Sequence, residues 1–348
     1  MRRGVQVWGF ISGTMSTEER ITLKHGAGGT AMVELIEEVF AAAYGDANAP
    51  RDDSARLDLT GPLAFTTDSF VVDPIFFPGG DIGRLAVAGT VNDLLAVGAR
   101  PVALSASFII EEGLPVRDLV TVAQSMAKTA AEAEVRIVTG DTKVVARGSA
   151  DKVFITTSGV GCVLRDGISG AAAKPGDAII LTGSIGDHGA AVMLAREKLL
   201  DTDAISSDTA PLNDIVLSLI NAECEIHTMR DPTRGGIGAA LNEIAKQSAV
   251  GIELEERAII VKPPVAAACE ALGIDPLYVA NEGKMLVIVS AADAQRSLDI
   301  IRQQRWGAEA SIIGRVTSNH PGQVRIRTSI GTTRVVSPPS GELLPRIC

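Results

Sequence analysis

Apolar and polar residues follow two different periods along the first half of the chain. Runs rich in β-branched and aromatic residues predict strands over residues 63–72, 101–110, 135–145 and 152–163. Apolar residues spaced three to four positions apart predict helices over residues 31–43, 83–99 and 115–133. Strands that alternate with amphipathic helices indicate a sheet with helices packed on it.

The second half repeats this mixed pattern after a small, polar stretch that contains Pro-Gly, RDGISGAAAKPGD, which is the expected linker. Strands are expected over residues 178–183, 250–256, 285–290, 310–316 and 323–329. Helices are expected over residues 190–194, 239–248, 265–272 and 293–304. The whole pattern predicts an α+β architecture in two domains, residues 21–165 and 176–336.

Length and composition agree with two globular domains. A chain of 348 residues is too long for one ordinary core. Hydrophobic residues make up 46% and charged residues 21%, which is a globular rather than a disordered composition. Because aromatic residues are only 3%, the core has to be built from Ala, Val, Ile and Leu.

The charge and hydropathy patterns exclude some functions. The net charge is −10 and no long basic run occurs, so we expect no nucleic-acid partner. An acidic protein of this kind needs metal ions to bind an anionic nucleotide. No segment reaches the roughly 18 apolar residues that cross a bilayer, so no membrane association is expected. The short apolar run in residues 1–20 lacks the features of a signal peptide, and we expect a disordered leader there.

Four cysteines, Cys162, Cys224, Cys269 and Cys348, are widely spaced and form no CxxC pair. Neither a zinc site nor a disulfide framework is supported, and a reducing cytoplasm fits this usage. The first three lie in apolar surroundings and are expected to be small buried residues. Cys348 differs, because it ends the proline-containing tail SPPSGELLPRIC, residues 337–348, which has no helical or strand period. We expect a mobile arm that reaches about 40 Å when extended.

Several aspartates adjoin small residues at expected strand ends or loops: Asp53, Asp68, Asp93, Asp141 and Asp231. Magnesium prefers oxygen ligands and usually shares one or two carboxylates with the phosphates of a nucleotide. Taken singly, each aspartate is more typical of a helix cap or a turn. As a set they are the candidate metal ligands, although spacing alone does not show that they converge.

Glycine-rich loops before helices supply candidate phosphate contacts through their backbone N–H groups. One loop is KHGAGGT, which alternatively serves as a flexible entry to the helix with Thr30 as its cap; two further loops are DPTRGG and GDHGA. The histidine of GDHGA is either a phosphate donor or a helix cap. The candidate nucleotide-binding residues, which include two neighbours of the aspartates, are Gly28, Gly29, Asn92, Thr142, His188, Thr233, Arg234 and Gly235.

Two charged residues border glycine at the ends of expected strands. Lys143 follows GDT, and Glu282 lies in ANEGK just before an apolar strand. Charged residues in such places usually face solvent. If they face a pocket instead, they are candidates for proton transfer, with a pKa set by their neighbours.

Seven segments, taken in chain order, carry a resemblance to a known family. They are TTDSFVVDPIFFPGGDIGRLAVAGTVNDLLAVGA, FIIEEGLP, VTGDTKVV, GDHG, DPTRGGI, ANEGK and the terminal PRIC. Together they resemble the HypE family of hydrogenase maturation proteins, the carbamoyl dehydratases of nickel–iron hydrogenase assembly. That family belongs to the ATP-using superfamily of aminoimidazole ribonucleotide synthetase and selenophosphate synthetase. The likeness runs from about Ile21 to Cys348, and PRIC is its most specific part.

The resemblance implies an activity for the terminal cysteine. Cys348 would receive a carbamoyl group from the carbamoyltransferase HypF, and ATP with Mg²⁺ would drive dehydration of the S-carboxamide to an S-cyanate. The cyano group would then pass to iron on a HypC–HypD scaffold complex. Either Lys143 or Glu282 would take the amide protons, and the residues leave this choice open.

The resemblance also implies a fold and an assembly. Two α/β domains of the aminoimidazole ribonucleotide synthetase type are expected, and the first domains of two subunits would pair into a β-barrel. ATP would lie in the cleft near that pairing. Residues before Met15 have no counterpart in the family pattern.

Two other classes of protein compete with this reading. A selenophosphate synthetase has its reactive cysteine near the N-terminus, whereas the first cysteine here is Cys162. A purine-pathway synthetase has no use for a thiol tail. A non-catalytic scaffold, in which the tail only docks to partners, would not turn over ATP when Cys348 is carbamoylated.

Overall fold

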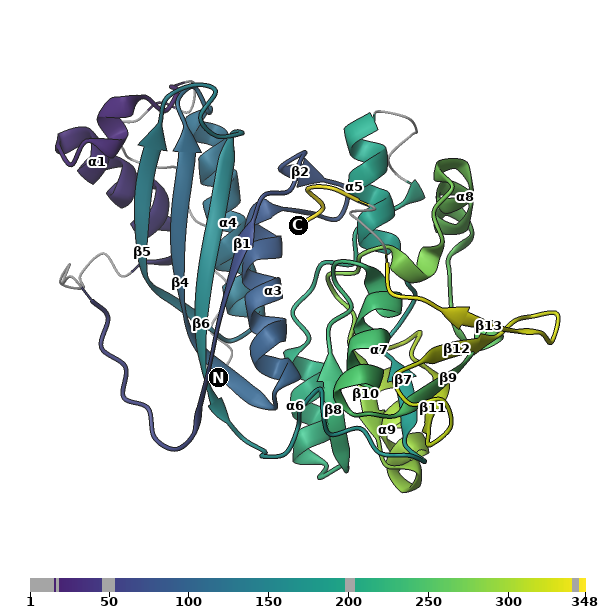
Figure 1. Cartoon of the computed structure of the whole chain (residues 1–348). Helices are drawn as coiled ribbons and strands as arrows, with labels where there is room; N and C mark the ends of the chain where they lie inside the picture. The colour runs from purple at the N-terminus through teal and green to yellow at the C-terminus, as the bar shows by residue number, and fades with distance from the viewer. Residues whose placement is uncertain (1–15, 17–18, 46–53, 198–203, 340–343) are drawn as a thin grey trace.

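The computed structural model describes residues 16, 19–45, 54–197, 204–339 and 344–348. Most of the predicted leader and the candidate ligand Asp53 lie outside these residues. Two α/β domains lie side by side, with the C-terminus between them (Figure 1). The α+β architecture predicted from the pattern is confirmed.

The N-terminal domain is built on a four-stranded sheet of order β1-β6-β4-β5. Its strands are β1 (Leu63–Phe70), β4 (Ala99–Glu111), β5 (Arg136–Val145) and β6 (Val153–Val163). β6 is antiparallel to both β1 and β4, while β5 runs parallel to β4. Helices α3 (Ile82–Ala96) and α4 (Val116–Glu132) cover one face of this sheet. The strands and helices predicted here are confirmed, with ends that differ by a few residues.

Helix α3 is buried on almost all sides because it packs against its own sheet and also meets the C-terminal domain through α6 and β8. Asp81 caps its first turn, since the Asp81 carboxylate accepts hydrogen bonds from the backbone of Gly83 at 2.7 Å and Arg84 at 3.1 Å. Small residues let the helix approach the sheet: a Cβ on Gly89 would lie 3.0 Å from the Phe70 ring.

The opposite face of this sheet carries no helix of the described chain. Its exposed side chains include Leu63, Phe65 and Ile109, and Phe65 is 75% exposed. Hydroxyl groups join neighbouring strands on the same face, as in the Ser158–Thr67 hydrogen bond of 2.9 Å. We call this surface the open face; it mixes apolar and small polar side chains.

The predicted helix over residues 31–43 is also present, as a continuous helical stretch with a π-helical turn in its middle. Its parts are α1 (Thr30–Leu35), η2 (Ile36–Ala41) and α2 (Ala42–Tyr44), preceded by the 3₁₀ turn η1 (Leu23–Gly26). The stretch packs on α4 and places Phe40 against Phe108 of β4, with ring centroids 4.6 Å apart. Two short strands, β2 (Phe76–Phe77) and β3 (Gly80–Asp81), precede α3.

The C-terminal domain contains a seven-stranded sheet of order β13-β12-β9-β11-β7-β10-β8. Its strands are β7 (Ala178–Leu181), β8 (Ile226–Arg230), β9 (Gly251–Glu255), β10 (Leu286–Val289), β11 (Ser311–Thr317), β12 (Val324–Arg327) and β13 (Thr333–Val336). Its α-helices are α5 (Asp187–Glu197), α6 (Asn213–Asn221), α7 (Gly236–Gln247), α8 (Pro263–Leu272) and α9 (Ala294–Arg302). The 3₁₀ turns are η4 (Glu256–Ala258), η5 (Pro276–Tyr278) and η6 (Ala291–Asp293).

Successive residues of the central strands point to opposite faces of this sheet. Ile180 and Val287 join an apolar cluster that includes residues of α6 and α9, whereas Ile179 and Ile288 join another that includes α7. Strands buried on both faces read as continuous apolar runs, which is why β7 and β10 were predictable. α6, β8 and β13 were not predicted; β8, for example, is only five residues long and contains His227.

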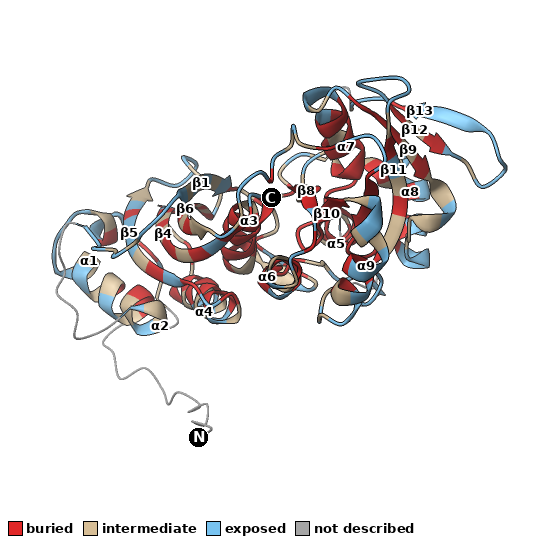
Figure 2. Cartoon of the chain, turned by 90° about the horizontal axis from the view of Figure 1, so that it is seen from below, coloured by how far each residue is buried: buried red, intermediate tan, exposed pale blue. Residues whose placement is uncertain are grey.

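One buried apolar cluster spans both domains. It includes Leu95 of α3 and Val216 of α6, so the domains share a core (Figure 2). Among the described residues, none of the helices has the length and apolar character that crossing a membrane requires.

A loop of the C-terminal half also ties the domains together. This crossing loop, residues 204–212, donates Ser207 N–H to the Pro78 carbonyl at 2.8 Å. Asn92 of α3 binds the loop with both ends of its amide: Nδ2 donates to the Ala210 carbonyl at 3.0 Å, and Oδ1 accepts Leu212 N–H at 2.9 Å. The relative position of the two domains is therefore specified by hydrogen bonds as well as by the core.

Candidate active site

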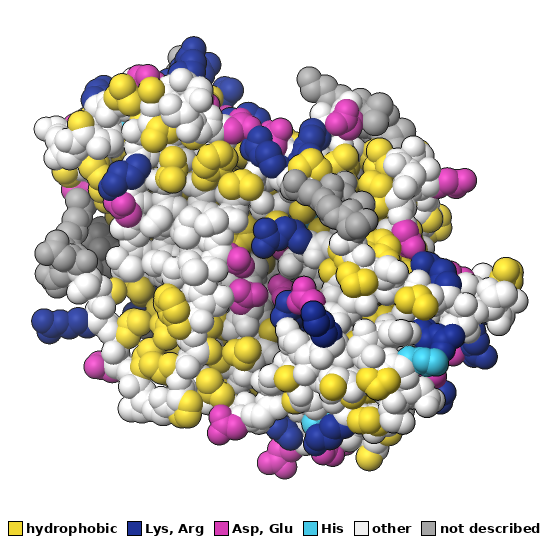
Figure 3. All heavy atoms as spheres, viewed as in Figure 1, with side chains coloured by type: hydrophobic (Ala, Val, Ile, Leu, Met, Phe, Trp, Pro, Cys, Tyr) yellow, Lys and Arg dark blue, Asp and Glu magenta, His cyan; other side chains and the backbone are white. Residues whose placement is uncertain are grey.

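A cavity of about 450 Å³ lies between the two domains. Its walls are β1, the end of α3, the linker at Ser169 and Gly170, and the loop that follows β8. Acidic and basic side chains gather in the hollow between the domains in Figure 3. We call it the interdomain cavity.

The interdomain cavity brings together seven of the residues predicted to form the site, although they come from five separate parts of the chain. They are Asp68, Asp93, Asp231, Thr233, Arg234, Glu282 and Cys348. Candidate ligands, phosphate donors, a proton acceptor and the terminal thiol therefore line one space.

Two of the carboxylates meet because β1 packs against α3. Asp68 alternates with exposed residues along β1, so it points toward the side of the sheet that α3 covers. Asp93 lies in the last turns of α3, and Thr66 Oγ1 donates a hydrogen bond of 2.7 Å to Asp93 Oδ2. The hydrogen bond fixes one oxygen of Asp93 beside the strand.

The loop after β8 is shaped by two glycines. Gly235 and Gly236 have φ values of 76° and 58°, which favour glycine, and a Cβ on Gly236 would lie 2.6 Å from the Leu277 carbonyl oxygen. This tight turn puts Thr233 and Arg234 at the start of α7, where the helix N-terminus favours negatively charged groups.

Burial raises the pKa of three carboxylates of the cavity. Burial raises the pKa of Asp68 to about 6, with Asp93 adding to the shift and Arg234 opposing it. Burial likewise raises the pKa of Asp231 to about 7, and Asp93 is the next largest cause. The pKa of Asp93 is itself raised by burial. A cation beside these oxygens would relieve the repulsion.

Glu282 is the most strongly perturbed acid of the site. Its side chain is 3% exposed, and its Oε1 has no hydrogen-bond partner. Burial, followed by the charges of Asp231 and Asp208, raises the pKa of Glu282 well above its ordinary value. A carboxylate in this environment is a strong proton acceptor.

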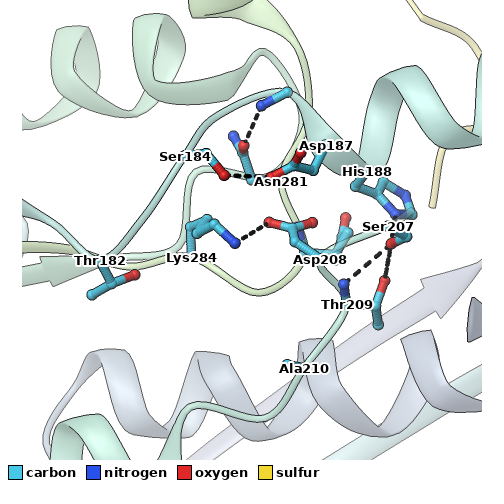
Figure 4. Close-up of polar contacts among 12 residues, drawn as sticks. Thr182, Ser184, Asp187, His188, Ser207, Asp208, Thr209, Ala210, Asn281 and Lys284 are labelled. Carbon is cyan, nitrogen blue, oxygen red and sulfur yellow. Dashed lines mark hydrogen bonds and ion pairs between the residues drawn. The ribbon is translucent and has the colours of Figure 1, made fainter. Parts of the chain in front are cut away.

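A buried ion pair between Lys284 and Asp208 contacts the backbone of Glu282. Glu282 N–H donates to Asp208 Oδ1 at 3.0 Å, and Lys284 Nζ lies 3.2 Å from Asp208 Oδ2. Figure 4 shows Lys284 pointing to Asp208, with His188, Ser207 and Thr209 on the other side of that aspartate. This ion pair was not predicted from the sequence. The only sequence feature that pointed to it was the lysine of ANEGK, two residues after Glu282.

The Cys348 thiol lies in the same cavity, half-buried. Burial, followed by the charge of Glu282, raises the pKa of this thiol to about 12, and Arg234 opposes the shift. Arg346, two residues before this thiol, pairs with Asp151, and its Nε donates to the Val71 carbonyl at 3.1 Å.

Three predicted site residues lie on β5, outside the interdomain cavity of their own chain: Asp141, Thr142 and Lys143. β5 is three strand spacings from β1, about 14 Å. Lys143 Nζ lies 2.8 Å from the Asp141 carboxylate, and both side chains are more than half exposed, at 62% and 55%.

The remaining nucleotide candidates also lie away from the cavity lining. Gly28 and Gly29 precede α1 beside β5, Gly235 forms the N-cap of α7, and the Asn92 amide is used by the crossing loop. His188 is fully buried at the start of α5, where it contacts the tail rather than the cavity.

Magnesium fits the oxygen donors of the site. Asp68, Asp93 and Asp231 offer the hard ligands that this ion prefers, and their raised pKa values reflect negative charge that a cation would neutralise. Within the described parts of the chain, no three acidic, histidine or cysteine side chains form a ready metal cluster. Shared coordination with nucleotide phosphates agrees with both observations.

Comparison with known proteins places the two domains in one class. The N-terminal domain of AIR synthase related proteins matches residues 51–163, and the C-terminal domain of the same proteins matches residues 174–327. The chain therefore has the two-domain architecture of the AIR synthase related proteins.

Individual relatives identify the family within this class of proteins. Carbamoyl dehydratase HypE of Azotobacter vinelandii is 52% identical over 332 residues, which is 94% of this chain and 97% of that protein. A crystal structure of hydrogenase maturation protein HypE in complex with ATP is 48% identical, with a TM-score of 0.90, covering 94% of this chain and 99% of the other. HypE in a crystal structure of a HypE–HypF complex is 50% identical, with a TM-score of 0.77, covering 88% and 99%. The chain belongs to the HypE family of carbamoyl dehydratases, as the resemblance implied.

Proposed function

We propose that this chain dehydrates an S-carboxamide on its own Cys348 to an S-cyanate at the expense of ATP, and so supplies the cyanide ligands of a nickel–iron hydrogenase. The observation that carries the proposal is the position of the Cys348 thiol, beside Glu282 in a cavity rich in carboxylates. The thiol at the chain end lies where an acid–base group and candidate phosphate contacts meet.

The reaction balances as the removal of one water from the carboxamide. The amide oxygen attacks the γ-phosphorus of ATP and releases ADP, which converts a poor leaving group into a phosphate ester. Loss of two N–H protons and cleavage of the C–O bond then leave a C≡N group on sulfur and free phosphate. The oxygen removed from the carboxamide therefore ends in the released phosphate.

Glu282 is the better of the two proposed proton acceptors. It lines the cavity that holds Cys348, and burial raises its pKa, which makes its carboxylate a stronger base than that of an exposed glutamate. Lys143 of the same chain lies three strand spacings away on β5. Lys143 serves the reaction only if it reaches the cavity of a second subunit.

Nucleotide binding is assigned to the loop after β8 and the carboxylates opposite it. Thr233 and Arg234 are the phosphate donors, at the N-terminus of α7. Asp68, Asp93 and Asp231 hold magnesium, which supplies positive charge against the phosphates. The relative crystallised in complex with ATP supports ATP as the nucleotide.

The carbamoyl group is accepted outside the cavity. A thiol needs to be a thiolate to act as nucleophile, and the seated Cys348 thiol with its pKa of about 12 stays protonated at neutral pH. The tail therefore leaves the cavity to meet the donor, HypF, and leaves again to deliver cyanide to the HypC–HypD complex. The HypE relative crystallised with HypF supports the first partner.

A homodimer forms through the open face. Exposed Leu63, Phe65 and Ile109 on a sheet face without a helix are suited to a second sheet, which would complete a barrel. Asp141 and Lys143 of β5 would then border the pairing. The free cysteines fit a reducing cytoplasm as the location.

Mass spectrometry of the C-terminal peptide tests the proposal. After incubation with HypF, carbamoyl phosphate and ATP, the mass of the tail should rise by roughly 43 Da and then fall to roughly 25 Da above the free thiol, from the atoms exchanged. Cys348→Ser should show neither change. A tail that stays unmodified, with ATP bound but not consumed, would favour the alternative of a non-catalytic scaffold.

A further inference from the structure

The described end of the tail, residues 344–348, occupies a seat between the domains. The seat lies between α5 and the segment 71–73 that follows β1, and Figure 1 shows the chain end there, close to β2 and α5. The Ile347 side chain is 2% exposed and belongs to the core cluster shared by the domains. This end of the chain is packed like a bound peptide.

Side chains of α5 bind three successive carbonyl groups of the tail. Arg196 donates Nη1–H to the Pro345 carbonyl at 2.8 Å and Nη2–H to the Arg346 carbonyl at 2.7 Å. His188 Nε2 lies 2.7 Å from the Ile347 carbonyl oxygen. All three contacts are to main-chain atoms and so do not depend on which side chains the tail carries.

The segment after β1 binds the other edge of the tail. Val71 N–H donates to a terminal oxygen of Cys348 at 3.1 Å, and Asp73 N–H donates to the Arg346 carbonyl at 3.3 Å. Alternate residues of one segment thus pair with alternate residues of the other, as when a peptide adds to the edge of a strand. The bond to the main-chain oxygen of Cys348 extends this pairing to the last residue.

His188 is held in one tautomer by its neighbours. The Ile347 carbonyl can only accept, so Nε2 carries the proton and Nδ1 accepts from Ser207 Oγ–H at 2.8 Å. Thr209 N–H donates to the same Ser207 oxygen at 3.1 Å. Phe77 lies edge-on to the imidazole, with ring centroids 5.4 Å apart. These contacts hold the ring with Nε2 toward the tail carbonyl.

We propose that this seat is a peptide-binding site for chains ending in Pro-Arg-Ile-Cys, that it accepts such a peptide in trans, and that His188 is its positioning residue. The proposal deepens the proposed function by naming the substrate class, and it rests on that function only for what happens to the sulfur afterwards. Every contact cited above is made by residues 345–348, so covalent attachment is not part of the recognition.

Two side chains give the seat its selectivity. Ile347 fills an apolar site, and Arg346 pairs with Asp151 and donates to the Val71 carbonyl. A short tether supplies an effective concentration of about 1 mM, so the attached tail stays seated even if the free peptide binds with a Kd of roughly 0.1–1 mM. Such weak intrinsic binding lets the tail leave for its partners.

Binding of a labelled peptide to the full chain tests the proposal. The probe is Leu-Pro-Arg-Ile-Cys with fluorescein at its N-terminus, added to the Ile347→Asp chain, whose own tail no longer fits the seat. Fluorescence anisotropy should reach half-saturation near 0.1–1 mM protein. The same peptide with Asp at its Ile position should bind at least about tenfold more weakly. The unaltered chain, with its own tail seated at an effective concentration of about 1 mM, should also bind the probe more weakly, by about two- to tenfold.

Matched variants of the positioning residue separate its role from general stability. In the Ile347→Asp background, His188→Leu should weaken peptide binding about tenfold, because a buried carbonyl loses its donor. His188→Gln should restore most of the affinity, since its amide N–H can donate to the same oxygen. No saturable binding by an Ile347→Asp chain that keeps its unfolding midpoint would overturn the proposal, as would equal binding by His188→Leu.

A second measurement uses the full chain with its own tail and serves if Ile347→Asp does not fold. Alkylation of Cys348 by iodoacetamide at pH 8, followed by intact-mass analysis, should be about tenfold faster in His188→Leu than in the unaltered chain or His188→Gln. Cys162, on the N-terminal sheet, is the internal reference. Equal rates in all three chains would overturn the proposal. Neither measurement needs ATP, so a seated tail that is never dehydrated would count against the proposed function alone.

Discussion

At the scale of single residues, the protein concentrates negative charge where its chemistry is proposed. Asp68, Asp93, Asp231 and Glu282 line one cavity, and burial raises the pKa of each, with neighbouring carboxylates adding to the shift for Asp68, Asp231 and Glu282. Such an arrangement is unfavourable for folding and is therefore typical of a functional site rather than of a structural one. Three predictions follow from these carboxylates.

The first prediction concerns the metal ligands. Asp68→Asn and Asp93→Asn should each weaken binding of magnesium–ATP at least about tenfold, because each removes one charged oxygen ligand. Isothermal titration with and without magnesium measures the effect. Asp166→Asn, an exposed aspartate in the linker, is the matched control and should bind normally. Normal affinity in both cavity variants would contradict the ligand assignment.

The second prediction concerns the pH dependence of stability. The folded-state pKa of Asp231 is about 7, above its ordinary value, so its favourable contribution is present below about pH 4 and is lost as the pH rises through 7. Without nucleotide or divalent ions, Asp231→Asn should therefore become more stable than the unaltered chain by about 1–3 kcal/mol at pH 8, since each pKa unit corresponds to about 1.4 kcal/mol and the half-open cavity screens part of it.

Thermal unfolding of both chains between pH 5 and pH 8 checks this expectation. The difference between the two midpoints should grow with pH. A constant difference would mean that Asp231 does not titrate in this range.

The third prediction separates the two proposed proton acceptors. Glu282→Gln should bind ATP and accept the carbamoyl group, but dehydration should slow by about 100-fold or more, because the general base is lost. The C-terminal peptide should then remain at the carboxamide mass. Lys143→Ala is the comparison; if it stalls the reaction while Glu282→Gln does not, the base has been assigned to the wrong residue.

At the scale of elements, the site depends on how three of them begin or end. β1 presents Asp68, α3 ends beside it with Asp93, and the turn before α7 presents Thr233 and Arg234. These elements are rigid parts of the two cores, whereas the tail contributes only its last residues. The half of the site proposed to bind the nucleotide is therefore preorganised.

The fourth prediction tests the turn before α7. Gly236→Ala should destabilise the fold by about 1–3 kcal/mol and weaken ATP binding, because φ is positive and the new Cβ would lie 2.6 Å from a backbone oxygen. Gly273→Ala, at the end of α8 with φ of 68° and open space around it, is the matched control. It should cost about 1 kcal/mol and leave ATP binding unchanged. Chemical denaturation and titration with ATP give the two readouts.

At the scale of the whole molecule, the two domains share a core, and the crossing loop connects them to the tail. The Ala210 carbonyl of the loop accepts a hydrogen bond from the Asn92 side chain of α3. The Asp208 carboxylate of the loop accepts from Glu282 N–H, and the Ser207 hydroxyl donates to His188 Nδ1. Domain position, proton acceptor and tail seat are therefore linked in one buried polar network.

The fifth prediction concerns the open face. Phe65 is 75% exposed on that face, so Phe65→Asp should lower the dimer fraction at micromolar concentration by at least about tenfold. Ile330→Asp, at an 85% exposed site in the C-terminal domain, is the matched control and should leave assembly unchanged. Analytical ultracentrifugation measures both. A dimer that survives Phe65→Asp would place the interface elsewhere.

Much of this architecture was predictable from local patterns. Continuous apolar runs such as β7 and β10 indicated buried strands, and three of the aspartates singled out beside small residues, Asp68, Asp93 and Asp231, line one cavity. β8 escaped prediction because its burial comes from neighbouring elements. Asp208 escaped because nothing in its own neighbourhood shows that its carboxylate faces Lys284, far away in sequence.

By itself, the sequence determined the alternation of strands and helices, the glycine turn before α7 and the thiol at the chain end, since each depends on residues close together in the chain. Only the tertiary structure decided which candidates meet. It assigned His188 to the tail rather than to the cavity and put Lys143 on another strand. The physical reason is that pKa, hydrogen bonding and access depend on distance in space, which local patterns do not record.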